Sequence, residues 1–268
     1  MPLRAPARAG FRRRKDVPAD LLARLNAGVE QTATLTETTV MDFAALMRAV
    51  FPDCAPEVLG TLSSDLPLLR RMENAGHFLA NLPDLDGVFT HAMGHRADTV
   101  RGWAAWILRD RGRKGADLRT VLDSVRPLAD DSHFGVREWA WIALRPAVLA
   151  DLPRAFELLR LWTGEDSENL RRFAVEILRP RGVWCAHCPQ LKADPSPGED
   201  FLTPLRDDPS RYVRLSVANW LNDASKTRPE WVDSLCARWE EESPTPRTRH
   251  IVRHARRSLR PKLWKTSP

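Results

Sequence analysis

The sequence predicts an all-α protein, an α-solenoid of stacked helical hairpins, and two observations support this prediction. A short segment recurs along the chain, and its clearest copies place an apolar residue directly before an arginine. Amphipathic stretches with helical spacing lie between the copies, and no alternating strand pattern is evident. Units that cannot bury an apolar face alone, and therefore stack on their neighbours, are typical of a solenoid.

The recurring segment sets the size of the repeating unit. Its arginines are 36, 34, 43 and 35 residues apart, which is the length of a helical hairpin: Arg101, Arg137, Arg171, Arg214 and, in a degenerate copy, Arg249. The copies read RADTVRGWAAWILRD, HFGVREWAWIALRP, SENLRRFAVEILRP, SRYVRLSVANWLND and RTRHIVRHARRSLRP. We expect the repeat arginines Arg137 and Arg171 to hold neighbouring repeats together rather than to bind a partner.

Amphipathic segments supply the partner helix of each hairpin. They cover residues 117–129, 151–162 and 230–242, and caps of Asp, Ser or Pro precede the repeat helices. Residues 38–51 and 65–82 also read as helices, either as diverged copies or as a capping bundle. We expect one repeat domain over residues 17–260, a basic disordered tail over 1–16 and a short tail over 261–268.

The long third interval contains an insertion, RGVWCAHCPQLKADPSPGED, that is rich in Pro and Gly. Solenoids accept insertions on their loop face, which is often the binding face. Cys185 and Cys188 have the spacing of metal ligands, but no second pair accompanies them, and a structural zinc site needs four ligands. We therefore expect no metal and, without a phosphate-binding glycine motif, no cofactor.

The charge of the chain favours an anionic partner. The formal net charge is +6 and the isoelectric point is about 9.5. Both ends are cationic: no acid occurs among the first fifteen residues or from Ser243 onward. Nucleic acid is the commonest partner of such proteins. No apolar stretch is long enough to span a bilayer, so we expect a monomeric cytoplasmic protein with no membrane partner.

One face of the repeat helices varies from copy to copy. Positions one and five after the repeat arginine share this face, and they include two carboxylates, Glu138 and Glu176. Position eight supplies a cationic ridge, and regularly spaced cations suit a phosphate backbone, so we expect Arg109, Arg145 and Arg179 to contact DNA. The alternative is that both acids form salt bridges between repeats.

Four segments together resemble the AlkC-type DNA alkylation-repair glycosylases, HEAT-like repeat proteins related to AlkD. The segments are FGVREWAW, ENLRRFAVEILRPRGVWCAH, DDPSRYVRLSVANWLNDASKTRPEWV and SPTPRTRHIVRHARRSL. The resemblance runs from about Asp98 to Leu259. It implies an enzyme of base excision repair with a concave DNA-binding surface. The substrates it implies are cationic alkylated bases in duplex DNA, chiefly 3-methyladenine, with 3-methylcytosine and 1-methyladenine in range. The chain resembles a shorter branch without a C-terminal immunoglobulin-like domain.

The resemblance also implies roles for individual residues. Glu138 and Glu176 correspond to acidic site residues and Trp184 to an aromatic one. Arg172 would clamp a phosphate or hold Glu176. Either Trp141 or Trp139, which cannot both share the direction of Glu138, would contact the base or sugar, and we choose Trp141 for DNA. The cationic C-terminal run adds Arg253 and Arg257 as DNA contacts.

The chemistry of a cationic base fits such a site. A base methylated at N3 already carries positive charge, so it leaves without a general acid. Positive charge then develops on the deoxyribose, as in other oxocarbenium-like hydrolyses. A partly desolvated carboxylate, for which we choose Glu138, stabilises this charge and can orient water. The alternatives are a non-catalytic solenoid that binds DNA or protein partners, and a paralogue that binds damaged DNA without excision.

Overall fold

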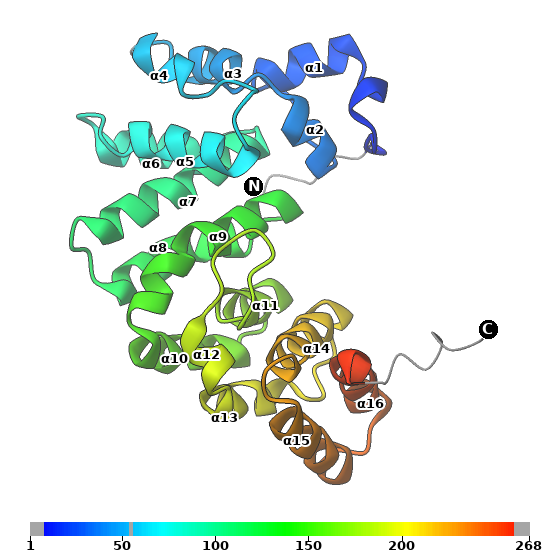
Figure 1. Ribbon diagram of the computed structural model, residues 1–268. Helices are drawn as coiled ribbons and strands as arrows, with labels where there is room; N and C mark the ends of the chain where they lie inside the picture. The colour runs from blue at the N-terminus through cyan, green and yellow to red at the C-terminus, as the bar shows by residue number, and fades with distance from the viewer. Residues whose placement is uncertain (1–7, 54–55, 260–268) are drawn as a thin grey trace. The chain divides into compact units, whose positions relative to one another are not determined.

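The computed structural model describes residues 8–53 and 56–259, and every regular element in these ranges is a helix (Figure 1). The prediction of an all-α repeat protein is thus confirmed. Where the sequence predicts one repeat domain over 17–260, the chain divides into two compact units, residues 1–147 and 148–268. Within the described ranges, no helix has the length and apolar character needed to cross a membrane.

The first unit consists of short N-terminal helices followed by longer repeat helices. In chain order they are η1 (Arg14–Asp16), α1 (Ala19–Asn26), α2 (Leu35–Val40), α3 (Phe43–Val50), α4 (Pro56–Gly60), α5 (Leu68–Leu79), α6 (Leu85–Gly94), α7 (Asp98–Arg113), α8 (Leu118–Ala129) and α9 (Phe134–Ala150), whose last residues belong to the second unit.

Helices α5, α6 and α7 follow one another through the first unit, and α7 contacts α5, α6 and α8 (Figure 1). Two glycines permit close packing of these helices. A Cβ atom on Gly76 would lie 2.1 Å from Cβ of Trp106, and one on Gly102 would lie 2.6 Å from Cδ1 of Trp139. The glycine in the variable column of the first copy is therefore explained by packing, because only hydrogen fits beneath the indole.

The second unit contains the remaining repeats and the insertion. Its elements are α10 (Leu152–Arg160), η2 (Leu161–Gly164), α11 (Glu168–Ile177), α12 (Pro189–Ala193), η3 (Ser196–Gly198), α13 (Glu199–Leu202), η4 (Thr203–Leu205), α14 (Arg211–Ser225), α15 (Pro229–Glu242), α16 (Pro246–Ala255) and η5 (Arg256–Ser258). Helix α14 packs against α11, α15 and α16. The insertion contributes the short elements α12 and η3.

The predicted core positions are buried in both units. The residues three and seven positions after the repeat arginine are at most 1% exposed in the first four copies: Ala104, Leu108, Ala140, Leu144, Ala174, Leu178, Val217 and Leu221. Burying one leucine contributes about 2 kcal/mol relative to leaving it exposed. This repeated stripe therefore stabilises the helix packing within each unit.

The repeat arginines are structural, as expected. Arg101 donates through Nε and Nη2 to both carboxylate oxygens of Asp131, at 2.7 and 3.1 Å, and Arg171 binds Asp208 in the same way at the same distances. The Nη1 atom of each arginine donates to two backbone carbonyls just before its own helix. We call this pattern the arginine rung. It joins a repeat to the turn of the next one with fork-shaped hydrogen bonds.

The N-terminal segment differs from the expected disordered tail. Residues 1–7 of the expected N-terminal tail and the whole expected C-terminal tail, 261–268, lie outside the described residues. From Arg8 onward the chain is held in place, because Arg8 binds Glu37 with both terminal nitrogens and the backbone N–H of Phe11 donates to the same carboxylate. Composition predicts disorder here because local sequence does not reveal that Arg8 binds Glu37 in α2.

Candidate active site

Glu138 lies on α9 in the first unit, where the helix places it beside a tryptophan. The side chain is half-buried, and its Oε2 accepts a hydrogen bond from Nε1 of Trp141 at 3.0 Å. Trp141 is only 3% exposed, and a buried indole N–H needs an acceptor. The pair therefore explains why a carboxylate lies among indoles: the indole satisfies its donor and fixes the orientation of the acid.

The two tryptophans beside Glu138 belong to the core. Trp139 is 7% exposed and packs on Gly102, while Trp141 is directed to Glu138. The ring of Trp141 is buried and its N–H is engaged by Glu138. That Trp141 contacts DNA stays a prediction.

Glu176 lies on α11 in the second unit, inside a hydrogen-bond network. Its Oε1 accepts from the Ser216 hydroxyl at 2.6 Å, and its Oε2 accepts from Nη1 of Arg179 at 3.0 Å. Nη2 of Arg172 is 3.7 Å from Oε1. Burial alone would raise the pKa of Glu176, but Arg172, Arg179 and Ser216 together lower it. Glu176 is therefore ionised and fixed by its arginine partners, which is what the salt-bridge alternative predicts for this acid.

Arg172 is held by α14 as well as by Glu176. Its guanidinium lies 4.3 Å from the centre of the Tyr212 ring, and Tyr212 and Ser216 are one turn apart on α14. Sequence reasoning missed both of these residues. The available signal was their polar spacing with Asn219 at positions i, i+4 and i+7, which indicates a polar face on a repeat helix.

The cationic ridge predicted from the sequence is largely buried. Arg109 is 5% exposed, pairs with Glu73 at 2.7 Å and with Asp110 at 2.9 Å, and stacks on Trp106. Arg145 is 1% exposed. Protein covers both side chains in this structure, and that these two arginines contact DNA stays a prediction.

Arg179 is likewise occupied within the second unit. Its guanidinium bridges Glu176 and Asp223, with Nη2 at 2.8 Å from Oδ2 of Asp223. Burial would lower the pKa of Arg179, but these two carboxylates raise it. Arg179 therefore links α11 to α14 through these two carboxylates.

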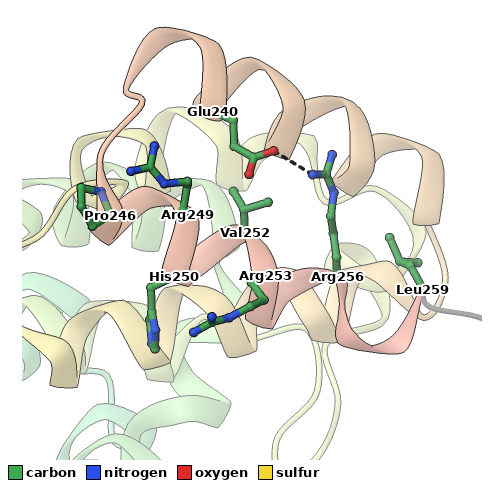
Figure 2. A pocket seen from close by; sticks show the side chains of 8 residues that line it. All are labelled: Glu240, Pro246, Arg249, His250, Val252, Arg253, Arg256 and Leu259. Carbon is green, nitrogen blue, oxygen red and sulfur yellow. Dashed lines mark hydrogen bonds and ion pairs between the residues drawn. The ribbon is translucent and has the colours of Figure 1, made fainter.

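Of the two predicted cations near the C-terminus, Arg253 lines a pocket. Its volume is about 710 Å³, and Arg249, His250 and Arg253 line it together with Glu240, Pro246, Val252, Arg256 and Leu259 (Figure 2). Arg256 is paired with Glu240 and Asp233. Arg253 is exposed and forms no hydrogen bond or ion pair with any described residue, whereas Arg257 donates to the side-chain carbonyl of Asn219.

The insertion presents an apolar tip. Trp184 is 59% exposed and its neighbour Val183 is 68% exposed, whereas most described tryptophans are buried. The structure thus leaves the indole of Trp184 accessible to a ligand of the second unit. Among the described residues, no group of three His, Cys, Asp or Glu side chains could hold a metal ion.

Known proteins similar to this chain include DNA-repair enzymes. The solved structure of the alkylpurine DNA glycosylase AlkC from Pseudomonas fluorescens, bound to DNA containing an abasic site analog, has a TM-score of 0.65 and 28% identity. The match covers 89% of this chain and 62% of that one. AlkD2 from Streptococcus mutans has a TM-score of 0.59 and 21% identity, over 70% of this chain and 88% of its own.

Sequence comparison adds one curated relative. The uncharacterised protein YhaZ of Bacillus subtilis is 38% identical over 137 residues, which are 51% of this chain and 37% of YhaZ. No family model matches the chain. The chain therefore spans less than two thirds of both YhaZ and AlkC. Its helical architecture places it in the superfamily of HEAT-like repeat proteins to which AlkC and AlkD2 belong.

Proposed function

We propose that this protein is a DNA glycosylase that releases cationic alkylated bases from duplex DNA. The observation that carries the proposal is Glu138, a half-buried acid on a repeat helix whose orientation is fixed by Trp141. The similarity to AlkC, an alkylpurine DNA glycosylase bound to DNA, supports the reaction class. 3-Methyladenine is the proposed main substrate, with 3-methylcytosine and 1-methyladenine as further candidates.

The proposed role of Glu138 is electrostatic. As the cationic base departs, positive charge spreads over C1′ and O4′ of the deoxyribose, and a fixed carboxylate stabilises that charge without reorganising. The same carboxylate can accept a proton from the water that attacks C1′. The bond from base to sugar breaks with its electron pair moving to the base, which becomes neutral.

Other residues are proposed to hold DNA rather than to react. Arg253 and Arg257 offer guanidinium groups at the end of the second unit, and Arg172 offers one beside Tyr212. Trp184 is proposed to stack on an exposed base or sugar, since its ring is accessible. Glu176 is proposed to set the positions of Arg172 and Arg179, because both arginines contact its carboxylate.

The direct test is base release from duplex DNA treated with a methylating agent, with 3-methyladenine, 7-methylguanine and 3-methylcytosine resolved. We expect the wild-type protein to release 3-methyladenine. Glu138→Gln should lower the single-turnover rate at least about a hundredfold while leaving duplex binding intact.

A matched control is Glu157→Gln. Glu157 is an exposed acid of α10 that pairs with Arg154, so the change in charge is the same and excision should persist. Equal release by wild-type and Glu138→Gln protein would remove Glu138 from the mechanism. Duplex binding without release by the wild type would favour a non-catalytic solenoid.

A further inference from the structure

Four consecutive cations lie at the surface of the first unit. Arg12, Arg13, Arg14 and Lys15 are all exposed, and we call them the basic strip. None of their side chains forms a hydrogen bond or ion pair with an acid among the described residues. A basic run at a chain end is usually a solvated tail, so its fixed position needs explanation.

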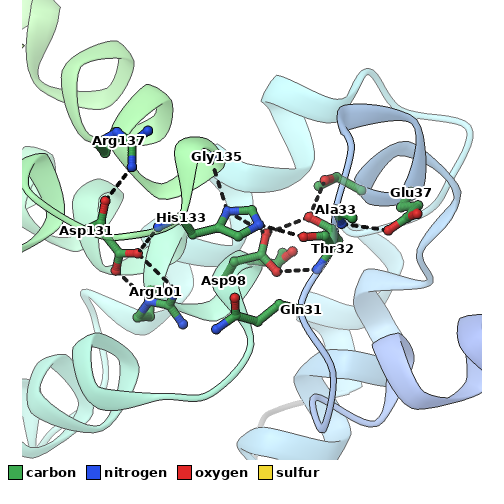
Figure 3. Close-up of polar contacts among 12 residues, drawn as sticks. Gln31, Thr32, Ala33, Glu37, Asp98, Arg101, Asp131, His133, Gly135 and Arg137 are labelled. Carbon is green, nitrogen blue, oxygen red and sulfur yellow. Dashed lines mark hydrogen bonds and ion pairs between the residues drawn. The ribbon is translucent and has the colours of Figure 1, made fainter. Parts of the chain in front are cut away.

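The basic strip is anchored by a buried acid. Glu37 is fully buried, and its carboxylate accepts four hydrogen bonds: from Nη1 and Nη2 of Arg8 at 2.8 and 2.7 Å, from the Phe11 N–H at 2.9 Å and from the Ala33 N–H at 2.7 Å. Figure 3 shows Glu37 beside Ala33 in this part of the fold. Burial alone would raise the pKa of Glu37, but the Arg8 contact and the backbone donors lower it. The carboxylate is therefore charged and fixed.

Two threonines of the α2 region hold the backbone next to the strip. The Thr34 hydroxyl donates to the carbonyl of Phe11 at 2.6 Å, and the Thr36 hydroxyl donates to the carbonyl of Arg12 at 3.3 Å. Thr34 lies directly after Ala33, whose N–H also binds Glu37. The backbone that enters the strip is thus tied to the fold, while the four cationic side chains remain exposed.

The surroundings of the strip add positive charge. Arg71 lies buried on α5, where it donates to the carbonyls of Met41 and Thr39 and stacks on Phe43. Burial lowers the pKa of Arg71 and the nearby Arg14 lowers it further, whereas Asp42 opposes this shift. Holding like charges close together is unfavourable unless a partner supplies negative charge.

We propose that the basic strip is a preformed contact for the phosphate backbone of duplex DNA, separate from the residues that surround Glu138. This inference rests on the proposed function. Arginine matches a phosphate with two parallel hydrogen bonds, and three of the four cations are arginines. Because the backbone is already anchored, binding requires little further ordering of the chain, and preorganisation of this kind raises affinity.

The test compares two triple variants with equal changes in charge. One is Arg12→Gln/Arg13→Gln/Arg14→Gln. The control is Arg48→Gln/Arg96→Gln/Arg119→Gln, which removes three exposed arginines of the same unit. The Kd for an undamaged duplex is measured across a range of salt concentrations, together with the single-turnover rate of excision at saturating methylated duplex.

We expect the strip variant to bind at least about tenfold more weakly at low salt. The slope of log affinity against log salt should become shallower by about 2–3, since each phosphate contact contributes about −0.9. The control should keep most of the wild-type slope, and excision at saturation should match the wild type in both variants. Equal losses in the two variants would assign the effect to net charge and overturn the proposal.

Other outcomes separate this inference from the proposed function. Wild-type protein that neither binds the duplex nor excises methylated bases would refute the proposed function itself. A wild type that binds and excises, with a strip variant that binds equally well, would refute only the basic strip. Unchanged DNA binding with lost binding to vesicles of anionic phospholipid would reassign the strip to a membrane surface.

Discussion

Glu138 and Glu176 lie on the same face of their repeat helices, yet their surroundings differ. Glu138 is half-buried and accepts a hydrogen bond from the indole of Trp141. Glu176 is 4% exposed, and a hydroxyl and two arginines approach its oxygens. The difference teaches that acids on the same face of the repeat helices can have different environments, one partly accessible and one buried in a network of ion pairs. On this contrast we base the proposal that Glu138 serves the reaction and Glu176 serves stability.

The largest expected effect is on stability, in Glu176→Gln. Removing the charge leaves Arg172 and Arg179 beside a neutral amide in a buried setting, which should cost about 3–5 kcal/mol of unfolding free energy. Urea unfolding of this variant and of Glu138→Gln measures the contrast. If Glu138→Gln proved the less stable of the two, the division of roles would be reversed.

The loss of unfolding free energy in Glu176→Gln should depend on pH in the acid range. The folded pKa of Glu176 lies below its ordinary value of 4.5, so the charged acid stabilises the fold above that pH. This stabilisation is lost as the pH falls from about 4.5 through the lower folded pKa. The difference in stability between wild type and variant should therefore shrink in that range, whereas a constant difference would contradict the ionised state of Glu176.

A smaller effect is expected for Trp141→Phe. This change keeps an aromatic ring but removes the N–H that holds Glu138, and it should cost about 2 kcal/mol of stability. Excision should slow about tenfold, because the acid loses a hydrogen bond that orients it. Single-turnover rates at saturating DNA check this expectation, and a change confined to Kd would show that Trp141 acts in binding instead.

The smallest expected effect is that of Ser216→Ala. It removes one donor to Glu176 while Arg179 keeps its contact, so the unfolding free energy should fall by about 1 kcal/mol. Urea titration detects a change of that size. A loss as large as that of Glu176→Gln would show that the hydroxyl, rather than the arginines, keeps the acid charged.

The sequence predicted the repeat, the buried stripe and the structural role of the repeat arginines, because local periodicity determines which face of a helix is apolar. It did not predict the environment of long polar side chains. Arg109 reaches Glu73 from a different helix, 36 residues away in the chain. The meeting of Arg172 with Tyr212 likewise depends on how α11 and α14 pack. Such pairings are set by tertiary structure, which helical spacing does not contain.

The arginine rung has a consequence for how this protein can diversify. The partners of the rung are 30 residues apart in Arg101–Asp131 and 37 apart in Arg171–Asp208, yet the geometry is the same. The intervening chain can therefore lengthen or be exchanged without disturbing the frame. Evolution or protein engineering could therefore exchange the loops between rungs while the packing of the repeat helices stays the same.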